Sequence, residues 1–415
     1  MLPEATTCPA CGYHVAVLFL DGGEQPLATL GWPQTEAEAR SMQRLPLRFV
    51  RCVECGHVFN SRFDYTRVPY TNKPNRMFNR GAGWSEFLTR LRDDIVDRLP
   101  PQPVVVEIGY GDGAFLRSLQ QANPRGRYIG FDPHGCSADA SSGLELHHDL
   151  FVPEVHLSAF KPHLIVSRHV LEHLSDPLGF IQRISFAASL AEIRSELYLE
   201  VPCIDRALAA ARLEDFYYEH NSHFTTESFS RMLRRGFTTI HSLGHGYNGE
   251  VVYAYLELKG SSAQLERARE ATEFLDAART AVDVIRLQLT SLIISGKRVA
   301  IWGGTGKSAA FLHAFGVDAE RFPLVVDSDP DKCGTYVPGT GQLIQSRDVL
   351  RDHPADVILI PPQWRAADIV AEMDAAGIRY ESVLIEHRGR LIDYFRDEHP
   401  YRKRYTEKGS VELLK

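Results

Sequence analysis

The chain has 415 residues, of which 44% are hydrophobic, 24% charged and 10% aromatic. This is the composition of a globular protein of about two to three domains, and it excludes a disordered, fibrous or collagen-like chain. The 46 Lys and Arg against 53 Asp and Glu give a net charge of −7, which offers no global attraction to nucleic acid or anionic lipid. We therefore expect neither a nucleic acid nor a membrane as a partner.

The N-terminal residues 1–7 lack the basic and apolar segments of a secretory signal. No later segment has the roughly 18 uninterrupted apolar residues of a membrane helix. The sequence therefore predicts a cytoplasmic protein. Its seven cysteines are too few for a disulfide scaffold in a chain of this length, and four of them form two close pairs. This arrangement indicates a metal site.

The two cysteine pairs are Cys-x-x-Cys motifs, each followed by a glycine: Cys8, Cys11, Cys52 and Cys55. Each motif directs two thiolates to one cation, and two motifs complete the tetrahedron of a structural zinc site with no position open for substrate. A redox pair or four unrelated thiols are the alternatives, and the matching glycines favour zinc. Between the pairs we expect strands at residues 13–20 and 45–51.

A strand, a glycine turn and a helix follow one another further along the chain. Residues 104–108 form a mostly apolar strand, typical of a parallel sheet covered on both faces. The glycines of the turn let the backbone approach a ligand at the helix N-terminus: Gly109, Gly111 and Gly113. The next strand, residues 127–131, ends at Asp132, whose carboxylate is placed to bind both ribose hydroxyls. These features predict a nucleoside cofactor.

These residues resemble the class I S-adenosylmethionine (SAM) methyltransferases. Residues 107–113 read Glu-Ile-Gly-Tyr-Gly-Asp-Gly and match the first motif of that family, and residues 130–133 match the second. The resemblance implies a Rossmann-like sheet and SAM as the cofactor. It also implies cofactor contacts by Glu107, Gly109, Gly111, Gly113 and Asp132.

The same resemblance extends to two later segments. Asp149 fits the turn that contacts adenine, although a solvated loop acid explains it equally well. Residues 164–173 fit the fourth strand and a following helix, with His169 and His173 four residues apart on one helical face. We interpret His169 as part of the cofactor pocket, and a metal-binding histidine pair is the less favoured alternative.

A third module begins with a long helix. Residues 261–295 contain neither proline nor glycine and carry apolar residues near helical spacing, which predicts a connecting helix that Gly296 ends. A new strand, residues 298–302, then opens the turn Gly-Gly-Thr-Gly-Lys-Ser at residues 303–308. A P-loop needs glycine at the position of Ile301, so we exclude an ATPase.

The later glycine turn predicts a second nucleotide crevice. Its backbone N–H groups and two polar side chains are placed for phosphate, and an aspartate after the next strand is placed for ribose. We expect substrate contacts from Gly303, Thr305, Lys307, Ser308 and Asp327. Strands at residues 357–360 and 382–385 support a second doubly wound sheet. A redox NAD site is the alternative, although the glycine pattern is incomplete.

The order of a double Cys-x-x-Cys module, a SAM domain and a Rossmann-like domain resembles the sugar C-methyltransferases of antibiotic deoxysugar pathways. The most particular matches are residues 217–220 (Tyr-Tyr-Glu-His), 248–251, 303–309 and 327–332. The resemblance implies an α/β protein with a zinc-binding module (1–75), a methyltransferase domain (76–260) and a Rossmann-like substrate-binding domain (261–415). Those enzymes methylate the carbon next to the ketone of a nucleotide-linked keto-sugar.

Methylation of carbon requires a base for the C–H proton and a donor for the developing charge on the ketone oxygen. Histidine titrates near neutral pH and suits the base. The resemblance favours His220 as the base, Glu219 as its partner or an auxiliary acid, and the hydroxyls of Tyr217 and Tyr70 as donors. Ordinary packing is the alternative for this segment, and its place after the strand at residues 197–202 favours catalysis.

Two departures from the family keep other functions open. Residues 361–364 read Pro-Pro-Gln-Trp where the family has a tryptophan-asparagine pair, and residues 246–248 lack its histidine-glycine pair. The alternatives are SAM-dependent O-methylation of a sugar or small metabolite and, less favoured, an NAD-binding oxidoreductase. The intact glycines and Asp132 argue against a non-catalytic scaffold.

Overall fold

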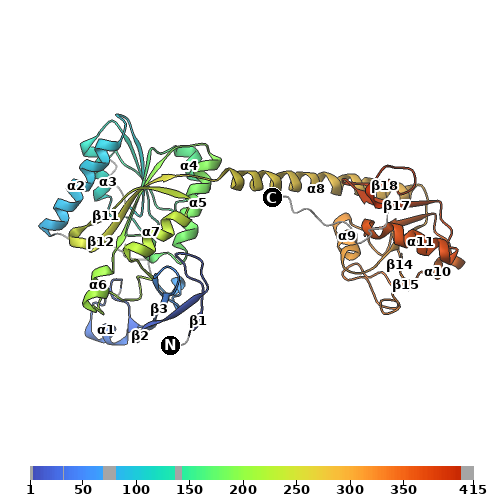
Figure 1. Cartoon of the computed structure of the whole chain (residues 1–415), viewed down its shortest axis with the longest axis horizontal. Helices are drawn as coiled ribbons and strands as arrows, with labels where there is room; N and C mark the ends of the chain where they lie inside the picture. The colour runs from blue at the N-terminus through green and yellow to red at the C-terminus, as the bar shows by residue number, and fades with distance from the viewer. Residues whose placement is uncertain (1–2, 31, 69–80, 136–142, 403–415) are drawn as a thin grey trace. The chain divides into compact units, whose positions relative to one another are not determined.

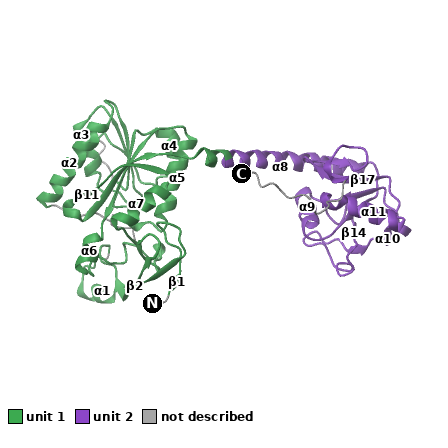
Figure 2. Cartoon of the chain, viewed as in Figure 1, with its two compact units in different colours: residues 1–266 green, residues 267–415 purple. Residues whose placement is uncertain are grey.

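The structure is a computed structural model that describes residues 3–30, 32–68, 81–135 and 143–402. It divides into two compact units, residues 1–266 and 267–415 (Figures 1 and 2). The segment that carries the cysteine pairs packs within the first unit and forms no unit of its own. The division into three domains therefore stays a prediction.

Unit 1 contains a five-stranded antiparallel sheet in the order β1-β2-β3-β4-β10. Its strands are β1 (Pro3–Ala5), β2 (Val15–Pro26), β3 (Arg44–Cys52), β4 (Val58–Asn60) and β10 (Ser222–His223). The two strands expected between the cysteine pairs are present as β2 and β3. Strand β10 comes from far along the chain and places Ser222 opposite Phe59 of β4. The N-terminal sheet thus takes its last strand from the segment that follows His220.

The N-terminal sheet also packs against that segment. Leu45, Phe49 and Val58 form one buried cluster with Phe216 and Tyr218. Two short helices, α1 (Glu36–Ser41) and the 3-10 turn η1 (Tyr65–Arg67), complete this part. The hydroxyl of Tyr218 accepts a hydrogen bond from the backbone N–H of Asp64 at 2.9 Å, which ties η1 to the same segment.

The second sheet of unit 1 has seven strands in the order β11-β12-β9-β8-β5-β6-β7. Strands β9, β8, β5, β6 and β7 run parallel, and β12 and β11 are added antiparallel at one edge. The bounds are β5 (Val104–Ile108), β6 (Arg127–Phe131), β7 (Glu145–His147), β8 (Leu164–Arg168), β9 (Glu196–Pro202), β11 (Thr238–Gly246) and β12 (Val251–Leu258). The Rossmann-like sheet expected from the sequence is confirmed.

Helices cover both faces of this sheet (Figure 1). On one face lie α2 (Ala82–Arg98) and α3 (Ala114–Ala122), and on the other α4 (Pro153–Phe160), α5 (Pro177–Leu190) and α7 (Thr226–Arg235). The neighbouring residues Val105 and Val106 of β5 belong to the clusters of opposite faces, and both are fully buried. A mostly apolar strand is therefore what this position requires. Helix α6 (Asp205–Ala210) and the 3-10 turn η3 (Tyr247–Gly249) lie in the connections.

The prediction of a helix directly after β8 is wrong. His169 adopts a left-handed conformation with φ +52°, and only the 3-10 turn η2 (Leu171–His173) follows. The next helix, α5, begins at Pro177, with the side chain of Asp176 as its N-cap. A residue before proline avoids the helical conformation, so Asp176 separates the turn from α5. His169 and His173 therefore do not share a helical face.

Unit 2 has a six-stranded sheet in the order β15-β14-β13-β16-β17-β18, parallel except for β18. The strands are β13 (Val299–Trp302), β14 (Leu324–Asp327), β15 (Ile344–Ser346), β16 (Val357–Ile360), β17 (Ser382–His387) and β18 (Arg390–Asp393). Helix α11 (Ala366–Ala376) packs on one face, and α9 (Lys307–Phe315) with the end of α8 (Ser262–Ile294) packs on the other. The second doubly wound sheet and the long connecting helix are both confirmed.

Short elements connect the strands of unit 2: α10 (Val349–Asp352), η4 (Gln363–Arg365) and η5 (Pro400–Arg402). Turn η4 directly follows β16, so it lies at the carboxyl end of the parallel strands. In the part of the chain that the structure describes, no helix combines the length and the apolar character needed to cross a membrane.

Candidate functional site

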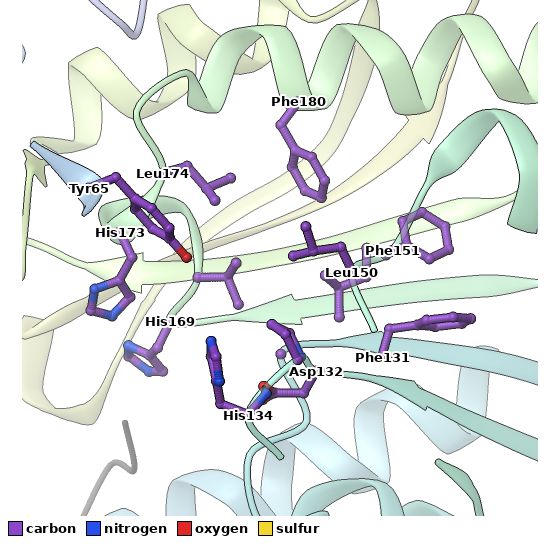
Figure 3. Close-up of a pocket in the computed structure, with 14 residues that line it drawn as sticks. Tyr65, Phe131, Asp132, His134, Leu150, Phe151, His169, His173, Leu174 and Phe180 are labelled. Atoms are coloured by element: carbon purple, nitrogen blue, oxygen red, sulfur yellow. Dashed lines mark hydrogen bonds between the residues drawn. The ribbon is translucent and has the colours of Figure 1, made fainter. Parts of the chain in front are cut away.

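A cavity of about 170 Å³ opens at the carboxyl ends of β5, β6 and β8, beside the first glycine turn (Figure 3). One end is apolar and is lined by Phe131, Leu150, Phe151 and Phe180. The other end is polar and is lined by Tyr65, Asp132, His134, His169 and His173. In an open α/β sheet, this edge of the parallel strands is where ligands bind.

The glycine turn has the geometry that requires glycine. Gly109, Gly111 and Gly113 have φ values of +78°, +56° and +70°. A Cβ at Gly109 would lie 2.3 Å from Cγ2 of Val170, whereas a Cβ at Gly111 would meet no described atom within 4 Å. Gly109 is therefore required by packing, and Gly111 borders open space where a ligand can approach the backbone.

Asp132 lies at the polar end of the cavity, as its predicted contact with ribose requires. Its Oδ2 accepts a hydrogen bond from the N–H of Gly111 at 2.9 Å, and its Oδ1 accepts one from the N–H of His134 at 2.8 Å. These two bonds fix the carboxylate against the glycine turn. Each oxygen keeps a second lone pair that can accept a further hydrogen bond.

Asp149 is exposed and does not line the cavity, whereas its neighbours Leu150 and Phe151 do. Glu107 is also not in the cavity lining, since it is buried in β5 with 3% of its surface exposed. Burial raises the pKa of Glu107 to about 8, which favours its neutral form. The sequence predicted that both acids contact the cofactor, but neither of them lines the cavity.

His169 forms part of the cavity wall and is held by two carboxylates. Its Nε2 lies 2.9 Å from Oε1 of Glu200, and its Nδ1 lies 3.4 Å from Oε1 of Glu172. Burial alone would lower the pKa of His169, but the interactions with Glu172 and Glu200 outweigh it and the pKa is raised. Both ring nitrogens face a carboxylate, so this ring suits a cation and leaves no nitrogen for a metal ion.

Glu200 binds two more partners below the cavity. The guanidinium of Arg168 donates to Oε1 of Glu200 at 3.1 Å, and the hydroxyl of Tyr198 donates to Oε2 at 2.7 Å. Burial would raise the pKa of Glu200, but the charges of Arg168 and His169 and these bonds lower it to about 2. The carboxylate therefore stays ionised and fixes the cationic side chains around it.

The segment with the predicted catalytic residues lies against the polar end of the cavity. The hydroxyl of Tyr217 and Nε2 of His220 are hydrogen-bonded at 2.9 Å. The ring of His220 packs edge-on against that of His173, with centroids 4.9 Å apart, and His173 lines the cavity. Nδ1 of His173 donates to the backbone oxygen of Glu219 at 2.8 Å. The structure thus brings Tyr217 and His220 together behind His173.

His220 is held in its neutral form. Burial, followed by the nearby His173, His223 and His169, lowers its pKa well below the ordinary value of histidine. Burial also raises the pKa of Tyr217, so its hydroxyl keeps its proton. A neutral imidazole beside a protonated phenol has one nitrogen able to accept a proton and one O–H able to donate.

Glu219 is fully buried, and the described hydrogen bonds of its carboxylate all go to the loop after β2. Oε1 accepts from the N–H groups of Thr29 at 2.7 Å and Leu30 at 3.0 Å, and Oε2 accepts from the N–H of Ala28 at 3.1 Å. The structure thus connects Glu219 to the N-terminal sheet, and no described hydrogen bond joins its carboxylate to His220. This contact spans 191 residues of sequence, so no local pattern could reveal it.

Tyr70 lies outside the described residues. A different tyrosine, Tyr65 of η1, lines the cavity, and Figure 3 shows its hydroxyl directed into it. Burial, and then the negative charge of Asp132, raise the pKa of Tyr65. The local sequence indicates only a turn here, because the side chain of Asp64 caps η1. A capping residue does not identify Tyr65 as a site residue.

The four predicted metal ligands come together. Cys8, Cys11, Cys52 and Cys55 are at most 3% exposed, and their sulfur atoms lie within 4.8 Å of one another. Gly12 and Gly56 have φ values of +74° and +76°, which explains the matching glycines after the two motifs. Four converging thiols suit a tetrahedral structural zinc site.

A second group of metal-ligand residue types is Glu172, His173 and His220, whose ligand atoms also lie within 4.8 Å of one another. Each member already has another described partner. Glu172 faces His169, His173 bonds to the backbone of Glu219, and His220 bonds to Tyr217. This grouping is therefore explained by the histidine network.

In unit 2, a crevice of about 240 Å³ lies at the later glycine turn. All five predicted contact residues line it: Gly303, Thr305, Lys307, Ser308 and Asp327. Gly303 has φ +105°, and a Cβ there would lie 2.5 Å from Oγ of Ser308. Trp364, noted above only as part of a departure from the family, and Arg365 also line the crevice, although neither was a predicted contact. They reach the crevice because η4 follows β16 at the same edge of the sheet.

Comparison with known families and proteins gives two domain matches and one relative. A family model described as a methyltransferase domain matches residues 79–242, and one described as the C-methyltransferase C-terminal domain matches residues 248–385. The chain is 24% identical to the C-methyltransferase NovU of Streptomyces niveus over 417 residues, which cover 93% of this chain and 94% of NovU. The similarity thus spans both units.

Two solved structures resemble part of the chain. A magnesium protoporphyrin IX methyltransferase from Synechocystis, with bound S-adenosylhomocysteine (SAH), is 15% identical with a TM-score of 0.32 over 43% of this chain and 84% of that one. A riboflavin-type dimethyltransferase, RosA, from Streptomyces davawensis is 22% identical with a TM-score of 0.31 over 43% and 56%. Similarity at these scores supports no conclusion about substrate or mechanism.

We expect Glu219→Ala to loosen the contact between residues 217–220 and the loop after β2. The change removes the acceptor of three backbone N–H groups, and each buried group left without a partner costs about 1–3 kcal/mol. Amide hydrogen exchange at residues 28–30 should accelerate by roughly tenfold or more, since about 1.4 kcal/mol corresponds to a factor of ten. Glu227→Ala, at an exposed side chain, is the matched control. Unchanged exchange at residues 28–30 would show that Glu219 does not hold the loop.

Proposed function

We propose that the chain is a SAM-dependent C-methyltransferase and that it methylates the carbon next to the ketone of a nucleotide-linked keto-deoxysugar. The observation that carries this proposal is the neutral His220, bonded to Tyr217 and packed beside the cavity, in a chain similar to a C-methyltransferase over nearly its full length. Methyl transfer to carbon requires removal of the C–H proton, and a neutral imidazole beside the cavity can act as that base.

SAM occupies the cavity of unit 1 in this proposal. The backbone around Gly109, Gly111 and Gly113 faces the cofactor, and Asp132 accepts hydrogen bonds from its ribose hydroxyls. Of the other residues predicted to contact SAM, His169 lines the cavity, whereas Glu107 and Asp149 do not. The apolar end suits the adenine ring.

The acceptor is activated by proton removal. A nitrogen of His220 takes the proton from the carbon next to the ketone, and the C–H electron pair forms the enolate, whose charge develops on the ketone oxygen. The hydroxyls of Tyr217, Tyr70 and Tyr65 are the candidate donors to that oxygen. The enolate carbon then attacks the methyl group of SAM, the S–CH3 bond breaks and SAH leaves. Glu219 acts as a positioning residue, because it fixes the segment that carries His220.

The crevice of unit 2 binds the nucleotide part of the acceptor. Methyl transfer uses one SAM, so a second crevice with the features of a nucleotide site is available for the acceptor. Lys307 and Ser308 lie at the start of α9, where backbone N–H groups and the helix dipole favour phosphate. The first alternative is O-methylation, and the atom that carries the new methyl group distinguishes it from C-methylation. The second is binding of NAD in this crevice, and titration with nucleotides tests it.

A structural zinc ion bound by Cys8, Cys11, Cys52 and Cys55 completes the proposal. The metal supplies no chemistry to the reaction and links the start of the chain to the end of β3. Strand β4 follows the second cysteine pair directly and pairs with β10, so the ion stabilises the sheet that holds the catalytic segment.

We expect Gly111→Val and Asp132→Ala each to weaken SAM binding by at least about tenfold. Valine is strained at φ +56° and fills the space beside the backbone, and alanine removes the acceptor of the ribose hydroxyls. Isothermal titration calorimetry measures both. Gly377→Ala introduces similar backbone strain at φ +66° in unit 2 and should leave SAM affinity unchanged. Parent-like affinity in both unit 1 variants would place the cofactor elsewhere.

We expect Cys52→Ser to lower the zinc content to well below one ion per chain and to reduce the stability of unit 1. The change removes one of four soft ligands from a site that has no other described ligand group. Metal analysis and thermal unfolding under reducing conditions report the two effects. Cys333→Ser, at a cysteine in unit 2, is the control and should retain the metal. Zinc-free parent protein with full stability would refute the assignment.

We expect His220→Ala to reduce turnover by about 10²- to 10⁴-fold while SAM affinity and the melting temperature stay close to those of the parent. Loss of a general base affects the chemical step, whereas loss of a packing residue affects all ligands and the stability together. Single-turnover methylation with a nucleotide-linked keto-deoxysugar measures the step. His245→Ala, at an exposed histidine outside the cavity, is the control. Loss of stability without a selective loss of turnover would contradict the role of His220.

A further inference from the structure

The crevice of unit 2 contains an exposed tryptophan that the phosphate contacts do not explain. Trp364 lies in η4 and is 44% exposed, although it lines a crevice that is otherwise mostly polar. The ammonium group of Lys307 lies 4.0 Å from the centroid of its ring. A cation placed over an aromatic face is attracted by the ring's π-electrons, so this face is oriented into the crevice and open to a partner.

The polar groups beside Trp364 are those of an anion site. Lys332 is 3.5 Å from carboxylate oxygens of both Asp327 and Asp329, so its charge is balanced. Lys307 and Arg365, in contrast, have no carboxylate within ion-pair distance among the residues that the structure describes. Two cationic side chains in one crevice without carboxylate partners favour an anionic ligand.

Ser308 is a second, independent indication of a ligand. Its side chain lines the crevice with only 4% of the residue exposed, and its hydroxyl has no hydrogen-bond partner in the described part of the chain. The hydroxyl itself is not sealed from the crevice, so it can donate a hydrogen bond to a ligand there. It lies in the first turn of α9, where phosphate oxygens are well placed to accept its proton.

Together, these groups form two adjoining subsites. Lys307, Ser308 and Arg365 suit a diphosphate, and the indole face of Trp364 suits a flat ring attached to it. Lys307 contributes to both subsites. Without a ligand its ammonium group covers the indole face that a ligand ring would occupy. A ligand with both parts would therefore replace the ammonium on the indole and give Lys307 a phosphate partner.

We propose that Trp364 is the stacking platform for the base of the acceptor's nucleotide, and that Lys307 moves from the indole face to the diphosphate when the nucleotide binds. This inference rests on the proposed function, since it takes the crevice as the site of a nucleotide-linked acceptor. It assigns specificity for the nucleotide to a residue at which the sequence departs from the related sugar C-methyltransferases.

Isothermal titration of the full-length protein with uridine or thymidine 5′-diphosphate, and separately with inorganic pyrophosphate, tests the proposal. Trp364→Ala should weaken nucleoside diphosphate binding by about 5- to 150-fold, the range expected for loss of one base stack, and leave pyrophosphate binding unchanged. Trp364→Phe should restore most of the affinity, because phenylalanine keeps an aromatic face. Lys307→Ala should weaken both ligands. Phe395→Ala, at an exposed aromatic residue of the same unit outside the crevice, is the control.

The outcomes separate this inference from the proposed function. If Trp364→Ala binds the nucleoside diphosphate as the parent does while Lys307→Ala does not, the platform is refuted and the crevice remains an acceptor site. If the parent binds neither nucleoside diphosphate nor pyrophosphate, both assignments fail. Tight binding of NADH with no binding of the nucleoside diphosphates would overturn both in favour of an NAD site.

Discussion

The attachment of residues 217–223 to the N-terminal sheet is the constraint on which the active centre depends. The carboxylate of Glu219 accepts hydrogen bonds from three successive N–H groups after β2, and Ser222 and His223 pair with β4. Neither contact involves the SAM-type sheet, although His173, in the turn after β8 of that sheet, also donates to the backbone oxygen of Glu219. The histidine proposed as the base is therefore positioned by the cysteine-containing part of the chain together with this turn. Because β4 directly follows the second cysteine pair, a metal ion there would stabilise the same frame. The N-terminal part is thus a component of the active centre.

Within that frame, the pKa values of two histidines close to one cavity are shifted in opposite directions. Glu172 and Glu200 raise the pKa of His169 against the effect of burial, whereas burial and the neighbouring histidines lower the pKa of His220. A neutral imidazole can accept a proton, whereas a cationic one donates protons and stabilises negative charge. These surroundings support the proposal that His220, and not His169, removes the proton.

Features that depend on local sequence were predictable. The paired cysteines, the glycine turns with positive φ, the parallel sheets and the long helix α8 all follow from motifs or periodicity within a few dozen residues. Two of the failed predictions have a common cause, which is dependence on distant contacts. The sequence did not reveal that Glu219 binds the loop after β2 or that Tyr65 enters the cavity, because each contact joins segments far apart in the chain. The prediction of a helix after β8 failed for a local reason. The Asp176-Pro177 step delays the helix, and it lies beyond residues 164–173, on which the prediction was based.

The central claim is that His220 removes a proton from the acceptor carbon before the methyl group is transferred. The most direct measurement is hydrogen exchange at that carbon in deuterated water, with SAH in place of SAM so that no methyl group can be transferred. The parent protein should incorporate deuterium next to the ketone of a nucleotide-linked keto-deoxysugar faster than the uncatalysed reaction, and His220→Ala should reduce that rate to the uncatalysed level. Exchange at an undiminished rate in His220→Ala would contradict the account, because another group would then be the base.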